Sequence, residues 1–172
     1  MALLFDAREA ILLSAAACEN CGMARFAHVN VVARDWRTLA EFYVKVFGCV
    51  PRPPERNLHG AWLDDVTSLK GAHIRGVHLA LPGHGDGGPT LEVFGYERPR
   101  ARGGLPPLNR PGFAHIAFVV DDVRKTLAKM ERRGGRPVGK IARTAIPGAG
   151  TLEIVYARDP EGNVVELQRW GE

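Results

Sequence analysis

Hydrophobic and polar positions along the chain form two similar series. Residues 26–35 (FAHVNVVARD) and 113–122 (FAHIAFVVDD) begin with the same three residues and continue as apolar, largely β-branched runs. Runs of this kind predict buried strands. Because they recur in the two halves of the chain, we interpret the sequence as a duplicated unit.

Each of these strands leads into a segment with helical spacing of its apolar residues. After Asp35 they recur as far as Phe47, where Gly48 ends the run, and after Asp122 they recur as far as Met130. An aspartate before a helix accepts hydrogen bonds from free N–H groups of the first turn, and glycine suits the left-handed position after the last turn. We therefore expect one helix after the first strand of each half.

Three more strands are expected in each half, separated by loops rich in Gly and Pro. They lie near 59–65, 73–81 and 90–96 in the first half, and near 136–142, 151–157 and 163–169 in the second. Each half is thus β-α-β-β-β, which predicts an α+β fold. The expected organisation is an N-terminal extension at 1–23, a first module at 24–96, an Arg-, Pro- and Gly-rich linker at 97–112 and a second module at 113–170.

Composition narrows the class of protein. The 172 residues are 45% hydrophobic and 24% charged, which excludes a disordered chain and a coiled coil. The net charge of +4 comes from dispersed basic residues, so no nucleic-acid partner is expected. No apolar run approaches the ~20 residues that span a bilayer, so no membrane association is expected either.

Cysteines and the N-terminus add little chemistry. Three cysteines, Cys18, Cys21 and Cys49, are an odd and low number, which argues against a disulfide scaffold. The single C-x-x-C at 18–21 lacks the second ligand pair of a structural zinc site. Acidic residues precede the apolar run at 10–17, which argues against an export signal and favours a cytoplasmic location.

Four polar residues occupy matching places in the two halves. His28 and His115 lie in the first strand of each half, and Glu92 and Glu166 lie in the last. Polar groups within apolar strands cost free energy unless they are paired or ligated. If the modules pack with pseudo-twofold symmetry, two imidazoles and two carboxylates can surround one divalent ion. The alternative is that each residue is simply hydrogen-bonded or faces water.

Strand alternation also suggests which side chains surround such a cavity. The expected wall consists of the aromatic residues Trp62, Phe94, Phe118 and Tyr156. His78, in the middle of its strand, either lines the same cavity or is a structural histidine.

The repeated modules, the FAH strand starts and the ending DPEGNVVELQ resemble the vicinal oxygen chelate superfamily, which includes glyoxalases, bleomycin-resistance proteins and extradiol dioxygenases. The resemblance covers about residues 24–170. It implies a curled mixed sheet around a metal-binding cavity, with His28, Glu92, His115 and Glu166 as ligands of a divalent ion (Zn, Ni, Co, Mn or Fe). It also implies a homodimer.

Within that superfamily the four-ligand set is most similar to glyoxalase I and methylmalonyl-CoA epimerase. Val32 and Tyr96 stand where glyoxalase I enzymes usually carry the Arg and Asn that hold glutathione, and no clear coenzyme A motif is present. The resemblance implies a metal-dependent isomerase, epimerase or lyase that moves a proton next to a carbonyl of a small carbonyl compound or a CoA-thioester-like substrate. Glu92 or Glu166 is then the base. The alternatives are an extradiol-type dioxygenase and a non-catalytic drug-binding protein.

Overall fold

The computed structural model describes residues 25–101 and 103–171, so the expected extension at 1–23 lies outside the described residues. The first half contains β1 (His28–Val32), α2 (Trp36–Phe47), β2 (Val50–His59), α3 (Ala61–Thr67), β3 (His73–Ala80) and β4 (Thr90–Tyr96). The second contains β5 (Ile116–Val119), α4 (Val123–Glu131), β6 (Arg136–Pro137), β7 (Ala142–Ile146), β8 (Gly150–Arg158) and β9 (Val164–Gly171).

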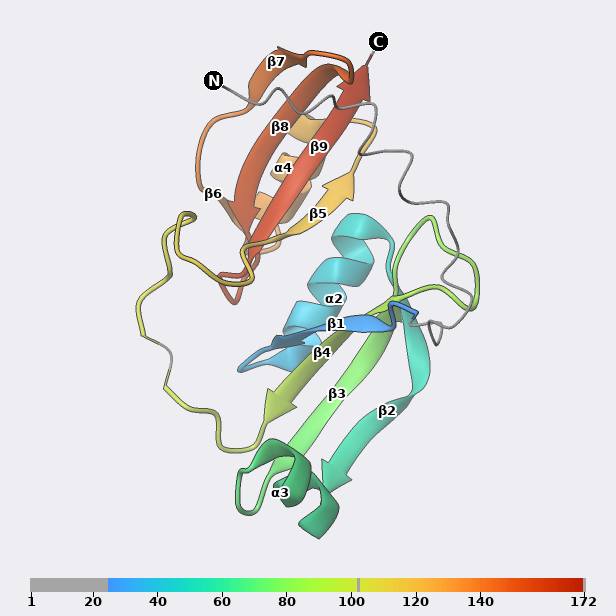
Figure 1. Ribbon diagram of the computed structural model, residues 1–172, viewed down its shortest axis with the longest axis vertical. Coiled ribbons are helices and arrows are strands. Elements are labelled where there is room, and N and C mark those ends of the chain that lie inside the picture. The colour runs from blue at the N-terminus through green and yellow to red at the C-terminus, as the bar shows by residue number, and fades with distance from the viewer. Residues whose placement is uncertain (1–24, 102, 172) are drawn as a thin grey trace, which may run out of the picture.

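Each half forms its own mixed sheet. The first has the strand order β1-β4-β3-β2, and the second has the order β5-β9-β8-β6 with β7 also paired to β8. In both sheets the first strand runs parallel to the last, and the other pairings are antiparallel. This confirms the predicted α+β fold of two repeated modules with curled mixed sheets (Figure 1).

The two expected helices begin and end where the sequence indicates. Asp35 accepts hydrogen bonds from the backbone N–H groups of Arg37 and Thr38, and Gly48 follows α2 in the left-handed conformation with φ of 74°. The Asp122 side chain accepts a bond from Lys125 N at the start of α4. Capping side chains therefore fix both helix starts.

The prediction of a strand near 59–65 is wrong, because α3 occupies Ala61–Thr67 and the preceding strand β2 ends at His59. Leu63 of this short helix is buried against Ile74 and Phe94, so tertiary packing decides its conformation. The expected strand at 136–142 is interrupted, with two residues in β6 and the remainder of the ladder in β7. The pattern of apolar residues did not predict either of these two differences.

The two faces of the first sheet have different roles. Residues of β1, β3 and β4 at alternate positions pack in the same core as α2: Val77, Leu79, Leu91 and Val93 are buried, and Val29 and Val31 are partly buried. The intervening positions point to the opposite face, because side chains alternate along a strand. That opposite face carries the polar residues of the candidate site.

The two modules are joined through α2, which lies at their junction in Figure 1, while α3 lies at the far end of the first sheet. Phe47 and Phe118 stack across the junction with ring centroids 4.0 Å apart. The Tyr43 hydroxyl donates to Asp159 Oδ2 at 3.0 Å, and both side chains are fully buried. One hydrophobic core therefore includes residues of both modules.

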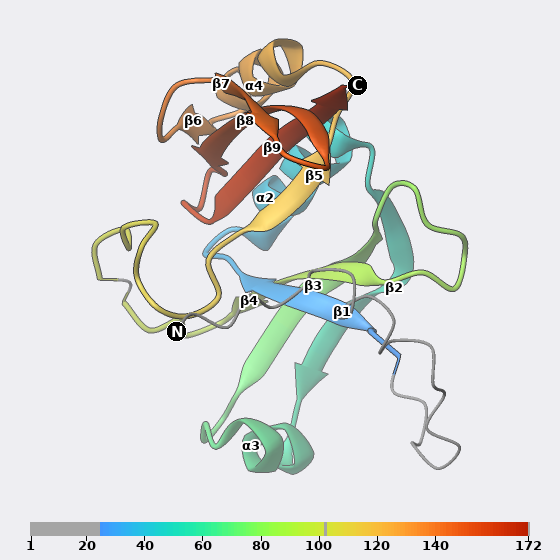
Figure 2. The same cartoon turned by 45° about the horizontal axis from the view of Figure 1, so that its top comes forward.

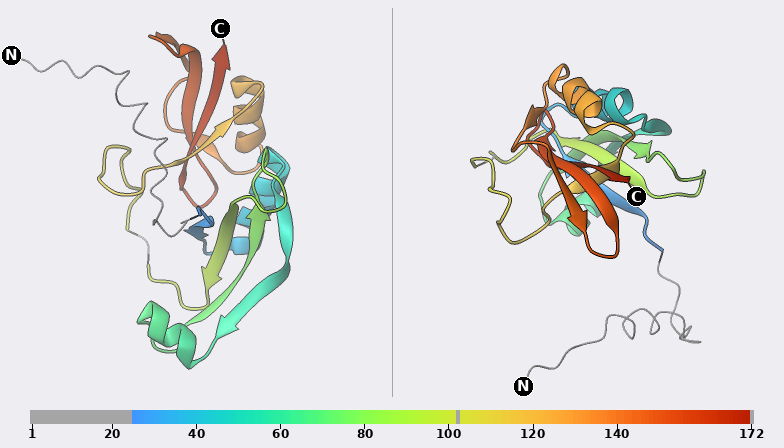
Figure 3. Two further views of the ribbon diagram at one scale, coloured as in Figure 1. Left: turned by 45° about the vertical axis from the view of Figure 1, so that its right-hand side comes forward. Right: turned by 90° about the horizontal axis from the view of Figure 1, so that it is seen from above.

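Figure 2 shows β1 and β5 as the strands that face each other between the two sheets. The connection between β4 and β5 loops away from the helices and returns to the start of β5 (Figure 3). No helix in the described part of the chain is long and apolar enough to cross a membrane.

Candidate functional site

On the polar face of the first sheet, the carboxylate of Glu92 is surrounded by three polar side chains. The ladder places Asn30 and His78 directly beside Glu92, on either side of it. The carboxylate of Glu92 lies 2.8 Å from His78 Nε2 through Oε1 and 3.3 Å from His28 Nε2 through Oε2. Asn30 Nδ2 donates to the same Oε2 at 3.3 Å. Glu92 is only 9% exposed, so these polar contacts replace the water lost on burial.

His78 is held at both ring nitrogens. Its Nδ1 lies 3.0 Å from Thr90 Oγ1, and its ring makes an edge contact with Phe94. An ionised carboxylate only accepts hydrogen bonds, so Nε2 carries the proton toward Glu92 and Nδ1 accepts from the Thr90 hydroxyl. Burial lowers the pKa of His78, although the nearby Glu92 charge opposes this shift. A neutral, fixed imidazole is the expected state at neutral pH.

The second module repeats the pair. His115, just before β5, has its Nε2 3.3 Å from Glu166 Oε2, and Glu166 is also 9% exposed. Tyr156 stands opposite Glu166 in the ladder and makes an edge contact with the His115 ring. Its hydrogen bond with Glu166 raises the pKa of Tyr156, and burial adds to the shift. Each module thus presents one buried carboxylate with a histidine at its first strand, His28 or His115, and further polar partners: His78 and Asn30 in the first module, Tyr156 in the second.

A cavity of about 300 Å³ is lined by residues of β1 and β5, and one residue of each set contributes to its wall. Asn30, which bonds to Glu92, lines it from β1, and His115, which contacts Glu166, lines it from the side of β5. Within the described residues, no ion pair of 4.0 Å or less links the first pair to the second. The structure therefore unites His28 with Glu92 and His115 with Glu166 but does not bring all four into direct contact.

The chemical types of these side chains suit a divalent ion, but the present spacing of the two pairs suits one less well. Each pair offers imidazole nitrogen and carboxylate oxygen, the ligands that borderline divalent metals accept. Yet no group of three or more His, Cys, Asp or Glu residues in the described ranges is arranged to hold a metal ion. The common four-ligand centre remains a prediction.

Comparisons with known proteins identify the family of this chain. A family model described as the Glyoxalase/Bleomycin resistance protein/Dioxygenase superfamily matches residues 25–167. This chain belongs to that superfamily. No curated protein matches the chain.

Solved structures support the superfamily fold. A glyoxalase family protein from Bacillus cereus is 19% identical, with a TM-score of 0.75 over 91% of this chain and 100% of that one. A glyoxalase family protein from Enterococcus faecalis is 22% identical, with a TM-score of 0.53 over 84% and 96% of the two chains. A glyoxylase/bleomycin resistance protein/dioxygenase domain from Frankia sp. EAN1pec is 19% identical, with a TM-score of 0.51 over 87% and 99%.

The aromatic residues expected around the superfamily cavity occupy different environments. Phe94 and Tyr156 contact His78 and His115, respectively. Phe118 is three positions after His115, so alternation places it on the opposite face, where it stacks on Phe47 in the core. Trp62 lies on α3 and is 54% exposed.

Two residues near the pairs were missed by the sequence interpretation. Asn30 follows His28 by two positions, so period-2 alternation could have placed it beside Glu92. Arg158 precedes the Asp159–Asn163 turn and lines the cavity, although it is only 7% exposed. No local pattern distinguishes it from the other arginines of this basic chain.

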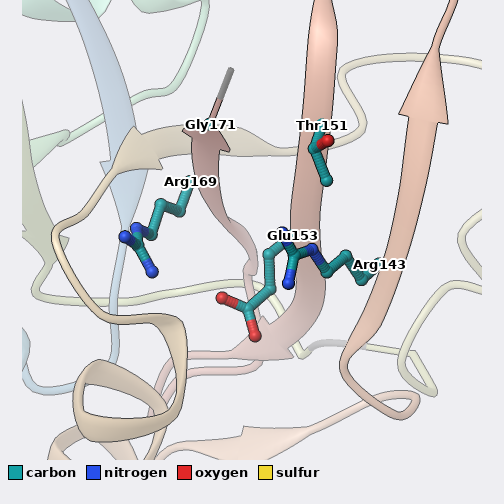
Figure 4. Close-up of a pocket in the computed structure, with 5 residues that line it drawn as sticks. All are labelled: Arg143, Thr151, Glu153, Arg169 and Gly171. Carbon is teal, nitrogen blue, oxygen red and sulfur yellow. The ribbon is translucent and has the colours of Figure 1, made fainter.

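A smaller hollow, of about 80 Å³, lies on the second sheet away from both pairs. Figure 4 shows Glu153 of β8 between Arg143 of β7 and Arg169 of β9, in one row across the ladder. Thr151 and Gly171 complete its lining. Because it is so small and open to the surface, it does not compete with the larger cavity as a substrate site.

Proposed function

We propose that this superfamily member is a divalent-metal-dependent isomerase, epimerase or lyase that moves a proton next to a carbonyl group of a small oxygenated substrate. One observation carries the proposal: equivalent pairs, His28–Glu92 and His115–Glu166, recur in the two modules. One residue of each set, Asn30 beside Glu92 and His115 beside Glu166, lines the same cavity. Repetition of a buried carboxylate beside an imidazole in both modules is unexplained by packing alone.

The residues that would hold the ion are His28, Glu92, His115 and Glu166. A bound divalent ion supplies Lewis-acid stabilisation of the negative charge that develops on a carbonyl oxygen when the neighbouring carbon loses its proton. The cavity that Asn30 and His115 line has room for a small substrate.

A glutamate carboxylate carries the proton in this proposal. Glu92 or Glu166 accepts the proton from the carbon next to the carbonyl, and the resulting carboxylic acid returns it to the substrate. An isomerase or epimerase of this kind leaves the number of protons unchanged over a cycle. Tyr156 and His115 orient Glu166, while His78 and Asn30 orient Glu92.

The test is exchange of hydrogen for deuterium at carbon in D₂O, followed by ¹H NMR with a panel of small ketones, aldehydes and oxo acids. The protein is loaded with Zn, Ni, Co or Mn, and its metal content is measured by elemental analysis. A general base contributes roughly 10²–10⁴-fold, so loss of the base by Glu166→Gln or Glu92→Gln is expected to lower exchange by about 100-fold or more.

Glu131→Gln is the matched control, because this residue is exposed at the end of α4. Its exchange rate is expected to equal that of the unaltered protein. Full exchange in both Glu166→Gln and Glu92→Gln, or undiminished metal content in His115→Ala, would refute the assignment. Oxygen uptake with catechol in the presence of ferrous iron would instead indicate a dioxygenase.

We also propose that the chain forms a homodimer. Strands β1 and β5 each pair with one neighbouring strand within the described residues, so each keeps one edge open for further contacts. Light scattering coupled to size-exclusion chromatography is expected to give twice the chain mass of 18.8 kDa. A mass of one chain at micromolar concentration would contradict this expectation.

A further inference from the structure

Arg158 places a buried positive charge at the cavity between the two modules. The residue lies at the end of β8 and is 7% exposed, and its side chain contributes to the cavity lining. On this strand it follows Tyr156 by two positions, so it belongs to the same sheet face as the His115–Glu166 pair. Its side chain therefore shares the lining of one cavity with His115, which contacts Glu166.

The guanidinium is held by neutral groups. Nη1 donates to the carbonyl oxygen of Gly162 at 2.8 Å, and Nη2 donates to that of Pro106 at 2.7 Å. Within the described ranges, no carboxylate lies within 4.0 Å of it. The neighbouring Asp159 carboxylate bonds instead to Tyr43 and Asn163. These contacts fix the guanidinium in place without neutralising it.

The cavity wall lacks a compensating negative charge. None of the described residues that line it is an aspartate or a glutamate, and Arg158 is the one arginine or lysine among them. Much of the remaining surface is apolar, including Val29, Val31 and Ile116. Arginine remains protonated at all physiological pH values, and a buried cation without a counter-charge is costly. An anion that enters the cavity relieves this cost.

The guanidinium retains donors for such an anion. Arginine has five N–H protons, and the two carbonyl contacts use one on each of Nη1 and Nη2. Nε makes no hydrogen bond to a described residue, and every fully buried side-chain nitrogen or oxygen among these residues does have a partner. Nε is therefore not fully buried and is free to donate. A planar carboxylate matches the fork of a guanidinium, whereas apolar walls favour an organic body over a bare inorganic ion.

We infer that the cavity binds a small organic carboxylate through Arg158, which makes the substrate of the proposed reaction an oxo acid. This inference rests on the proposed function for the reaction but not for the binding. Arg158 contacts the carboxylate, and the carbonyl end of the same molecule extends toward the two His–Glu pairs. Its role is in substrate specificity.

Binding is tested on the full chain, without added metal and in the presence of a chelator, by titration calorimetry with benzoate and with its neutral isostere benzamide. Benzoate is expected to bind at least tenfold more tightly than benzamide. Arg158→Gln is expected to weaken benzoate binding by about 10- to 100-fold, because a charge-assisted pair is lost, and to leave benzamide unaffected. Arg136→Gln provides the control, since this exposed residue stands opposite Arg158 in the ladder and its loss changes the net charge equally.

Arg158→Lys keeps the test decisive if Arg158→Gln does not fold. Lysine retains the charge but lacks the two-pronged fork, so severalfold weaker benzoate binding is expected. Equal binding of benzoate and benzamide, or unchanged benzoate affinity in the folded Arg158 variants, would overturn the inference. Inorganic phosphate that binds more tightly than benzoate would also overturn the assignment to a carboxylate.

Deuterium exchange of 2-oxobutanoate and of 2-butanone separates this inference from the proposed function. Preference for 2-oxobutanoate that disappears in Arg158→Gln supports both. Selective benzoate binding without exchange of either compound leaves the carboxylate site standing and refutes the proton-transfer function. Equal exchange of both compounds without selective benzoate binding refutes the carboxylate site and leaves the function standing.

Discussion

Replacement of Tyr43 by phenylalanine tests how strongly the two modules are joined. The Tyr43 hydroxyl of α2 donates to Asp159, which lies in the turn between β8 and β9 of the other module. Tyr43→Phe removes this hydroxyl but keeps the ring that packs against Phe42 and Phe47. Burial and the nearby Asp159 charge raise the pKa of Tyr43 well above its ordinary value, so the hydroxyl is the donor at neutral pH.

The structure gives the expected size of the effect. Both side chains are fully buried, so water does not replace the lost bond, and a hydrogen bond to a charged group contributes about 1.5–3 kcal/mol. Asp159 keeps its bonds from the Asn163 backbone and side-chain amides, which argues against a larger loss. For a protein of this size, Tm falls by ~2–4 °C for each kcal/mol of lost stability, so the expected decrease in Tm is about 3–12 °C.

The assay is thermal and urea unfolding at pH 7, with Tyr96→Phe as the matched control. Tyr96 is half-buried beside the smaller core cluster, and its hydroxyl makes no hydrogen bond to any described residue. We expect the control to lose less than about 0.5 kcal/mol. A Tyr43→Phe protein that unfolds at the Tm of the unaltered chain, or a control that loses as much, would refute the importance of this bond.

Three further substitutions test other parts of the fold. Burial raises the pKa of Asp159 above its ordinary 3.8, so its contribution to stability is complete below pH 3.8 and is lost as the pH rises through the pKa of the folded state. In urea unfolding at several pH values, the unaltered chain should lose stability relative to Asp159→Asn as the pH rises. A gain in relative stability with rising pH would contradict the direction of this pKa shift. Gly76→Ala is expected to cost roughly 3 kcal/mol or more, since a Cβ would lie 2.3 Å from a β4 carbonyl oxygen, while Gly139→Ala, in open space, should leave Tm nearly unchanged. Gly48→Ala should cost about 1 kcal/mol because its φ is 74°; an unchanged urea midpoint would show that the backbone relaxes there.

Local patterns were sufficient for much of the fold. The duplicated strand starts, the aspartate caps and the glycine after α2 depend on neighbouring residues and on side-chain periodicity, and the structure confirms them. The same periodicity identified His28, Glu92, His115 and Glu166, because a polar residue inside an apolar strand stands out in the sequence. Strand pairing then brought the histidine and glutamate of each module together.

What sequence alone determined is therefore the repeated module and the residue types on its polar face. Packing determined the rest: Leu63 is buried in a helix where a strand was expected, and Phe118 fills the core between modules. The cavity between β1 and β5 and the buried charge of Arg158 depend on how the modules and their linker meet. These contacts join residues far apart in the chain, so no local spacing specifies them, and only the tertiary structure decides which groups share one space.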